Sequence, residues 1–133
     1  MIYETIYRKL DRLGAIAALE AGQDYAKSQL GGAFMDLNMD VLERRADHIV
    51  IALSHYFEQN GDLCADPDME IRIYPARGMA EALTFQQAIP PIYREVYPAP
   101  GKVAPTLQRE LNGFLNTWLR NCLAQGHRFT GAA

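Results

Sequence analysis

The densest group of side chains capable of chemistry in this sequence is acidic. Four carboxylates lie close together along the chain, at Asp62, Asp66, Asp68 and Glu70. Carboxylate oxygens are the ligands that Mg²⁺ and Ca²⁺ prefer, and a bound metal ion can position a water for attack. One hypothesis is therefore a metal-assisted hydrolase or nuclease that uses these residues with His55 as a base. The alternative is a solvated turn whose Asp side chains bond their own backbone.

A second group combines an arginine with aromatic side chains. Arg72 and Tyr74 alternate within an apolar segment, which places them on one face of a strand, and Glu81 falls where a neighbouring strand is expected. Together with Trp118 they are candidates for a site that takes a small anion or a nucleotide, provided that the surface is concave. The alternative is that the aromatic rings pack between helix and sheet, with the arginine at the edge of that interface.

The usual catalytic and cofactor motifs do not occur in the sequence. It contains no Gly-x-Ser-x-Gly, P-loop or Gly-x-Gly-x-x-Gly pattern, and no Cys-x-x-Cys or His-x-x-x-His pair for a zinc site. Cys122 lies on the apolar stripe of an expected helix, which indicates a core thiol, and His55 is interpreted as a surface histidine at a strand end. We expect no cofactor, and the preferred hypothesis is a non-enzymatic binding or accessory protein.

Charge is distributed unevenly along the 133 residues, whose net charge is −3. Residues 31–74 carry nine acidic and three basic side chains, whereas residues 75–133 carry six basic and three acidic ones. This distribution argues against broad binding to nucleic acid, which needs a dense basic face. No apolar run approaches the roughly 20 residues that span a membrane. Without an export signal, we expect a cytoplasmic protein with reduced thiols.

The spacing of apolar residues predicts the elements that hold these groups. Helical periodicity predicts a helix at the N-terminus that ends by Gly22, and a longer helix that begins at Pro105 and ends before Gly126. Asn60-Gly61 marks a turn, and Pro67 indicates that the loop continues beyond it. Alternation and apolar runs predict five strands, at residues 34–42, 48–57, 69–74, 79–87 and 92–97.

This order of elements predicts an α+β fold. It consists of an N-terminal helix, an antiparallel sheet of about five strands and a C-terminal amphipathic helix packed on the sheet, because the connections are too short for parallel crossovers. We expect one domain over residues 1–133 with a frayed tail at 128–133. An open edge at the short fifth strand would allow pairing with a protein partner or with a second copy as a homodimer.

Several stretches resemble an uncharacterised bacterial family, the YqiB-like domain of unknown function. They are residues 69–74, 78–86, 97–98 and, most specifically, the helix 111–126 with its Leu-Asn-x-Phe-Leu-x-x-Trp-Leu-x-x-Cys-Leu-x-x-Gly pattern. Residues 58–68 and 103–108 depart from the family pattern. Residues 57–63 are similar, more loosely, to uncharacterised proteins of mobile genetic elements. The resemblance implies the architecture above and a bacterial, cytoplasmic setting, and it implies no substrate.

Overall fold

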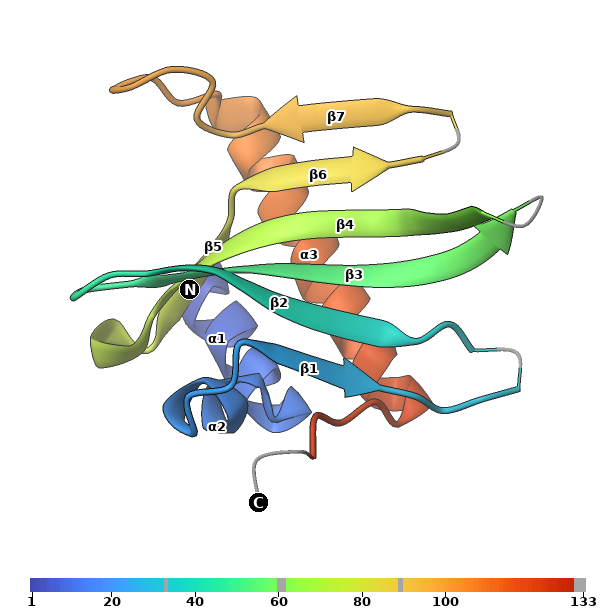
Figure 1. Cartoon of the computed structure of the whole chain (residues 1–133). Helices are drawn as coiled ribbons and strands as arrows, with labels where there is room; N and C mark the ends of the chain where they lie inside the picture. Colours follow the sequence, from blue (N-terminus) through green and yellow to red (C-terminus); the bar gives the residue numbers. More distant parts are fainter. Residues whose placement is uncertain (33, 60–61, 89, 131–133) are drawn as a thin grey trace.

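The computed structural model describes residues 1–32, 34–59, 62–88 and 90–130, and the side chains of residues 57–66 lie outside this description. Two helices at the N-terminus, a run of strands and one long helix follow one another along the chain (Figure 1). The helices are α1 (Ile2–Leu13), α2 (Ala15–Glu20) and α3 (Pro105–Gln125). The strands are β1 (Tyr25–Ser28), β2 (Leu37–Arg44), β3 (Ile49–Gln59), β4 (Asp62–Tyr74), β5 (Met79–Ala82), β6 (Thr84–Gln87) and β7 (Ile92–Glu95).

The strands form one antiparallel sheet in the order β1-β2-β3-β4-β6-β7, with β5 pairing the second half of β4. Apart from β4 and β6, which β5 separates along the chain, neighbours in this order are consecutive along the chain, so the sheet is largely a meander. In the described residues, β1 and β7 form its edges. A short 3₁₀ turn, Pro75–Arg77, joins β4 to β5 and ends at Gly78, whose φ of 62° suits glycine.

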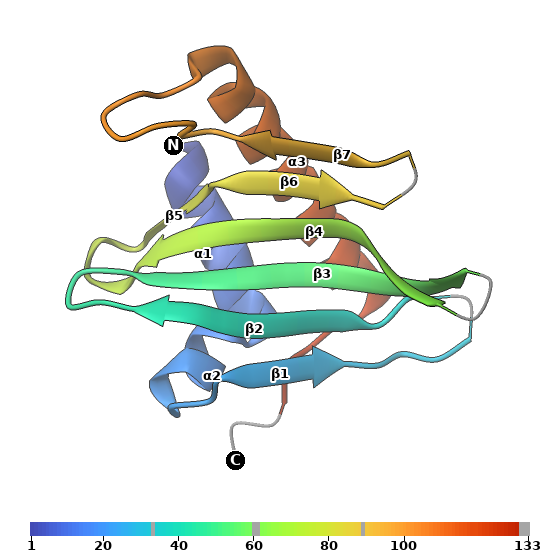
Figure 2. The same ribbon diagram turned by 45° about the horizontal axis from the view of Figure 1, so that its top comes forward.

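Both long helices pack on the same face of the sheet, and the opposite face, called the outer face below, carries no helix among the described elements (Figures 1 and 2). Side chains along the strands alternate between the buried inner face and the outer face. On β4, Met69, Ile71 and Ile73 point toward the helices and are fully buried, while Glu70 and Arg72 between them point outward and are half-buried. The core therefore lies between the inner face of the sheet and α1 and α3.

The predicted fold class is confirmed, with differences in detail. The predicted strand at 79–87 is divided at Leu83 into β5 and β6, and the chain contains an additional strand, β1, that the sequence pattern did not indicate. Pro67 was expected in a loop and instead lies within β4, at an irregularity of the pairing opposite His55. A proline is tolerated there because the bulge removes the need for its N–H. The predicted Asn60-Gly61 turn lies outside the described residues.

The N-terminal helix and the C-terminal tail both differ from the prediction, because the tail packs against a break in the helix. Gly14, with φ of 90°, separates α1 from α2, and a Cβ there would lie 2.4 Å from the carbonyl oxygen of Phe129. Phe129 is 5% exposed, and its N–H donates to the carbonyl of Leu13 at 2.7 Å. The expectation of a frayed tail from Arg128 onward is therefore wrong for these residues. Residues 131–133 lie outside the description.

Candidate functional site

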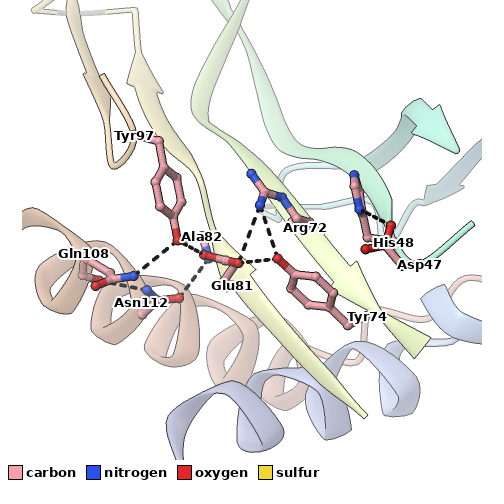
Figure 3. A network of polar contacts seen from close by, with 9 residues as sticks. All are labelled: Asp47, His48, Arg72, Tyr74, Glu81, Ala82, Tyr97, Gln108 and Asn112. Atoms are coloured by element: carbon pink, nitrogen blue, oxygen red, sulfur yellow. Dashed lines mark hydrogen bonds and ion pairs between the residues drawn. The ribbon is translucent and has the colours of Figure 1, made fainter. Parts of the chain in front are cut away.

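A carboxylate at the end of the sheet organises a connected group of polar side chains (Figure 3). Glu81 lies on β5 directly opposite Arg72 of β4, so both side chains are on the outer face. Glu81 is only 9% exposed. Its Oε1 accepts a hydrogen bond from the hydroxyl of Tyr97 at 2.6 Å, and its Oε2 accepts one from Tyr74 at 2.8 Å. Two phenols thus satisfy the carboxylate that burial would otherwise destabilise.

Arg72 completes this group without forming a close ion pair. Its Nη1 donates to the Tyr74 hydroxyl at 3.2 Å and lies 4.0 Å from Oε2 of Glu81. The guanidinium also lies over the ring of Tyr97, at 5.4 Å from the ring centre. Its Nε is buried and has no hydrogen-bond partner among the described residues. The arginine is therefore held in place while part of its hydrogen-bonding capacity is unused.

The two tyrosines act as donors over the whole physiological range of pH. Burial, reinforced by the hydrogen bond to Glu81, raises the pKa of Tyr97 to about 12. Burial and the same carboxylate also raise the pKa of Tyr74 above its usual value. Both phenols therefore keep their protons and donate hydrogen bonds to Glu81.

The first half of α3, on the inner side of the sheet, holds the group around Glu81 in position. Asn112 is 1% exposed, and its Oδ1 accepts the backbone N–H of Ala82 at 2.8 Å. Its Nδ2 donates to the carbonyl of Gln108 at 2.8 Å, and the Gln108 amide lies 3.4 Å from the Tyr97 hydroxyl. The helix and the sheet are thus joined by polar contacts immediately beside Glu81 (Figure 3).

The outer side of this group opens into a concave surface. A hollow of about 680 Å³ lies between Arg72, the ring of Tyr97 and the loop of residues 98–103, which includes Lys102. The loop is closed at its base, where the N–H of Ala104 donates to the carbonyl of Val96 at 2.8 Å. Two cations and no carboxylate line this hollow among the described residues. We refer to it as the cationic hollow.

Three of the four residues predicted for an anion site come together in this group, namely Arg72, Tyr74 and Glu81. Trp118 does not join them, because it lies on α3 and faces the inner side of the sheet, where its ring is 5.4 Å from that of His55. Helical periodicity also placed Trp118 on the apolar stripe of the last helix. The structure supports this assignment to the core, since Trp118 is 7% exposed.

The predicted metal ligands are described only in part. The side chains of Asp62 and Asp66 lie outside the description, whereas Asp68 and Glu70 are half-buried on the outer face. Burial, followed by the charge of Asp40, raises the pKa of Asp68, and burial with neighbouring carboxylates raises that of Glu70. Within the described residues, no group of three or more His, Cys, Asp or Glu side chains is suited to hold a metal ion.

A separate polar cluster lies on the inner side near the end of α3. His55, predicted at the surface, is 6% exposed, and its Nε2 lies 3.7 Å from the sulfur of Cys122. His127 is fully buried, 5.6 Å from His55 between ring centres, and its Nδ1 lies 2.8 Å from the hydroxyl of Ser28. The prediction of a surface histidine is wrong because α3 and the segment after it cover His55 with Trp118, Cys122 and His127. Cys122 is a core residue, as predicted, and burial raises its thiol pKa to about 12.

Sequence reasoning did not assign three residues that shape the site. Tyr97 and Lys102 lie in a loop whose proximity to β4 depends on the sheet order, which the sequence left open. Asn112 did carry a signal, since it is a polar residue beside Leu111 and Leu115 on the buried side of the last helix. A buried amide at such a position requires a hydrogen-bond partner, and here that partner is the backbone of β5.

Fold and site together define a small α+β protein whose antiparallel sheet is covered by helices on one face and carries a charged, concave site at the end of the other. Residues 4–128 match the model of a family described as a domain of unknown function (DUF6908), and the chain belongs to this family. Comparison with the curated proteins gives no match, and comparison with the solved structures gives none either. Among the described residues, no helix is long and apolar enough to cross a membrane.

Proposed function

We propose that this chain is a binding protein whose ligand is a small anion held in the cationic hollow. The observation that carries the proposal is the arrangement of Arg72, which is fixed by Tyr74 and Glu81 while it also lines a hollow that contains Lys102. A volume of about 680 Å³ lies within the range of small-molecule sites. The group that the anion contacts is pre-organised, so binding does not require the arginine side chain to be ordered first.

Two features favour binding over catalysis at this place. The tyrosines beside the hollow have raised pKa values and remain protonated, so neither supplies a base at neutral pH. Glu81, the buried carboxylate of this group, already accepts hydrogen bonds from both of them. These groups orient a ligand, and none of them is set up to take a proton from it. The bacterial source, the cytoplasmic location, the relation to YqiB-like proteins and a homodimer or protein partner stay predictions from the sequence.

Thermal unfolding with single anions tests the proposal. Inorganic phosphate, acetate, hexanoate and adenosine monophosphate are added separately at low ionic strength. A ligand at a hundred times its dissociation constant stabilises the folded state by about 2.7 kcal/mol, which shifts the midpoint of unfolding measurably. We expect at least one anion to raise the midpoint of the wild-type protein. If none of these anions stabilises the protein, the proposal is wrong.

Two variants and one control locate the site. Arg72→Gln and Lys102→Gln are expected to weaken the stabilisation by the anion, the former more strongly. Lys102 is exposed, so Lys102→Gln keeps the test valid if the Arg72 variant folds poorly. Arg94→Gln is the matched control, because Arg94 lies on β7 and lines different hollows with Leu107 and Glu110. Equal loss of stabilisation in the Arg94 variant would show that the anion binds by general charge alone.

A further inference from the structure

A second hollow adjoins the cationic one and has the opposite charge. It has a volume of about 200 Å³ and lies on the outer face over β4, β6 and β7. Its lining includes Glu70, Glu95, Tyr93 and Tyr97, with Arg72 at one side. Arg72 and Tyr97 also line the cationic hollow, so the two hollows share a wall. We refer to this second space as the acidic hollow.

In the part of the chain that the structure describes, the two carboxylates of the acidic hollow outnumber its one cation, Arg72, whose ion pair is with Glu81. Among the described residues, none of the ion pairs involves Glu70 or Glu95. The neighbours that act on the pKa of Glu70 are Asp68 and Glu95, which raise it in addition to the effect of burial. Burial and then the charges of Glu95 and Glu70 also raise the pKa of Tyr93. The hollow therefore concentrates negative charge that a bound cation would relieve.

The shape and the side chains of the hollow suit an ammonium group better than a bare metal ion. Two tyrosines line it, and aromatic faces attract organic ammonium ions. Thr84 also lines it, and its hydroxyl oxygen accepts the N–H of Glu70 at 3.1 Å. The described residues contain no cluster of acidic or histidine side chains suited to a metal. Carboxylates beside aromatic rings are the combination that recognises a protonated amine.

The distance between the two charged regions is set by the strand. Arg72 and Glu70 are two residues apart on β4 and on the same face, which corresponds to a separation of about 7 Å along the strand. Tyr97 stands between the regions and lines both of them. A single ligand can therefore place its negative end near Arg72 and Lys102 and its positive end near Glu70 and Glu95.

From this arrangement we propose that the ligand is a zwitterion, with an anionic group in the cationic hollow and an ammonium group in the acidic hollow, across a backbone spacing of about 7 Å between Arg72 and Glu70. This inference rests on the proposed function and specifies the chemical class of its ligand. An amino acid or peptide that carries a free side-chain amine and a carboxylate belongs to this class. Recognition of both ends distinguishes such a ligand from the simple anions and simple amines of the same length.

Three probes of equal chain length test the inference by isothermal titration calorimetry. They are 6-aminohexanoate, which carries both charges, hexanoate, which lacks the ammonium, and hexylammonium, which lacks the carboxylate. We expect 6-aminohexanoate to bind about tenfold more tightly than either of the others, because it alone satisfies both hollows. Glu70→Gln is expected to reduce the affinity for 6-aminohexanoate to that for hexanoate. Glu110→Gln, a glutamate on α3 outside both hollows, is expected to change neither affinity.

The outcomes separate this inference from the function on which it rests. If hexanoate binds as tightly as 6-aminohexanoate, the zwitterion inference is overturned and anion binding stands. If hexylammonium matches 6-aminohexanoate, the anionic end is not used and the inference is likewise overturned. If none of the probes binds and inorganic phosphate also fails to stabilise the protein, both proposals are wrong. Glu95→Gln provides a second variant of the acidic hollow, on an exposed side chain, if Glu70→Gln does not fold.

Discussion

Two groups of polar side chains adjoin α3. One contains charged side chains beside hollows, and the other contains buried side chains. Near the start of the helix, Glu81 and Arg72 are connected on the outer face, and Arg72 lines two hollows there. Near its end, His127 and Cys122 are buried and sealed beneath the sheet. Both groups are well connected by hydrogen bonds, so connectivity alone does not distinguish a site from a structural cluster.

The pKa shifts express the difference. In the histidine cluster, burial lowers the pKa of His127 and raises that of Cys122 to about 12, so both residues are held neutral. On the outer face, burial and the neighbouring carboxylates of Asp68 and Glu95 raise the pKa of Glu70, which forms no ion pair among the described residues. A buried cluster whose side chains are neutral, such as that of His127 and Cys122, stabilises the fold. Charged side chains that have no ion-pair partner beside a hollow indicate a ligand site.

The largest expected effect comes from removing the carboxylate at the centre of the first group. Glu81→Ala leaves the hydroxyls of Tyr74 and Tyr97 without their acceptor and Arg72 without its counter-charge. Loss of a buried, hydrogen-bonded charge of this kind is expected to lower the free energy of unfolding by about 3 kcal/mol. Urea denaturation followed by circular dichroism measures the change.

The control for this prediction is Glu110→Ala on α3, an exposed glutamate, which is expected to change stability by less than about 0.5 kcal/mol. If Glu81→Ala were as mild as its control, the hydrogen bonds around Glu81 would contribute little. The site would then not be rigid, and the argument from pre-organisation would no longer support the proposed function.

The histidine cluster is expected to respond to pH in a defined direction. Burial, and then the charge of His55, lowers the folded-state pKa of His127 below its usual 6.5, against smaller opposite effects of Asp36 and the Met35 backbone. Because the unfolded chain takes up the proton more readily, the stabilisation from neutral His127 is complete above pH 6.5 and is lost as the pH falls below that value. The hydroxyl of Ser28 and the thiol of Cys122 also face the cluster and stay neutral throughout.

A variant isolates this contribution from that of the carboxylates. His127→Asn retains a polar atom that can face Ser28 but does not titrate, so its stability is expected to fall less between pH 7 and pH 5 than that of the wild-type protein. Urea midpoints at several pH values measure the difference. Parallel curves for the two proteins would show that His127 does not titrate differently in the folded and unfolded states.

The sequence predicted the elements and half of the site for identifiable reasons. Alternation on β4 correctly placed Arg72 and Tyr74 on one face, because a period of two is a local property of a strand. The pairing with Glu81 followed from a short connection between consecutive strands. Trp118 was wrongly added because helical periodicity shows which residues share a stripe and does not show which end of the sheet that stripe faces.

What the sequence did not predict depends on contacts between distant segments. Tyr97 reaches Glu81 because β7 pairs with β6 and the N–H of Val96 donates to the carbonyl of Leu83, and residues 81 and 97 share no local pattern. The burial of His55 depends on α3 and on the segment after it, which brings His127 beside it. In both cases the decisive partner is remote in sequence, so periodicity and turn signals carry no information about it.

The smallest expected effect has the opposite sign to that of Glu81→Ala. Burial and the charge of Asp40 raise the pKa of Asp68 above its usual 3.8, so its ionised form destabilises the folded state at neutral pH. Asp68→Asn is therefore expected to raise the free energy of unfolding by about 0.5 kcal/mol at pH 7. The advantage should shrink as the pH falls toward 4, because the wild-type carboxyl then takes up its proton. A variant less stable than the wild-type protein at pH 7 would mean that Asp68 has a compensating partner. The carboxylates of the outer face could then not be described as unneutralised.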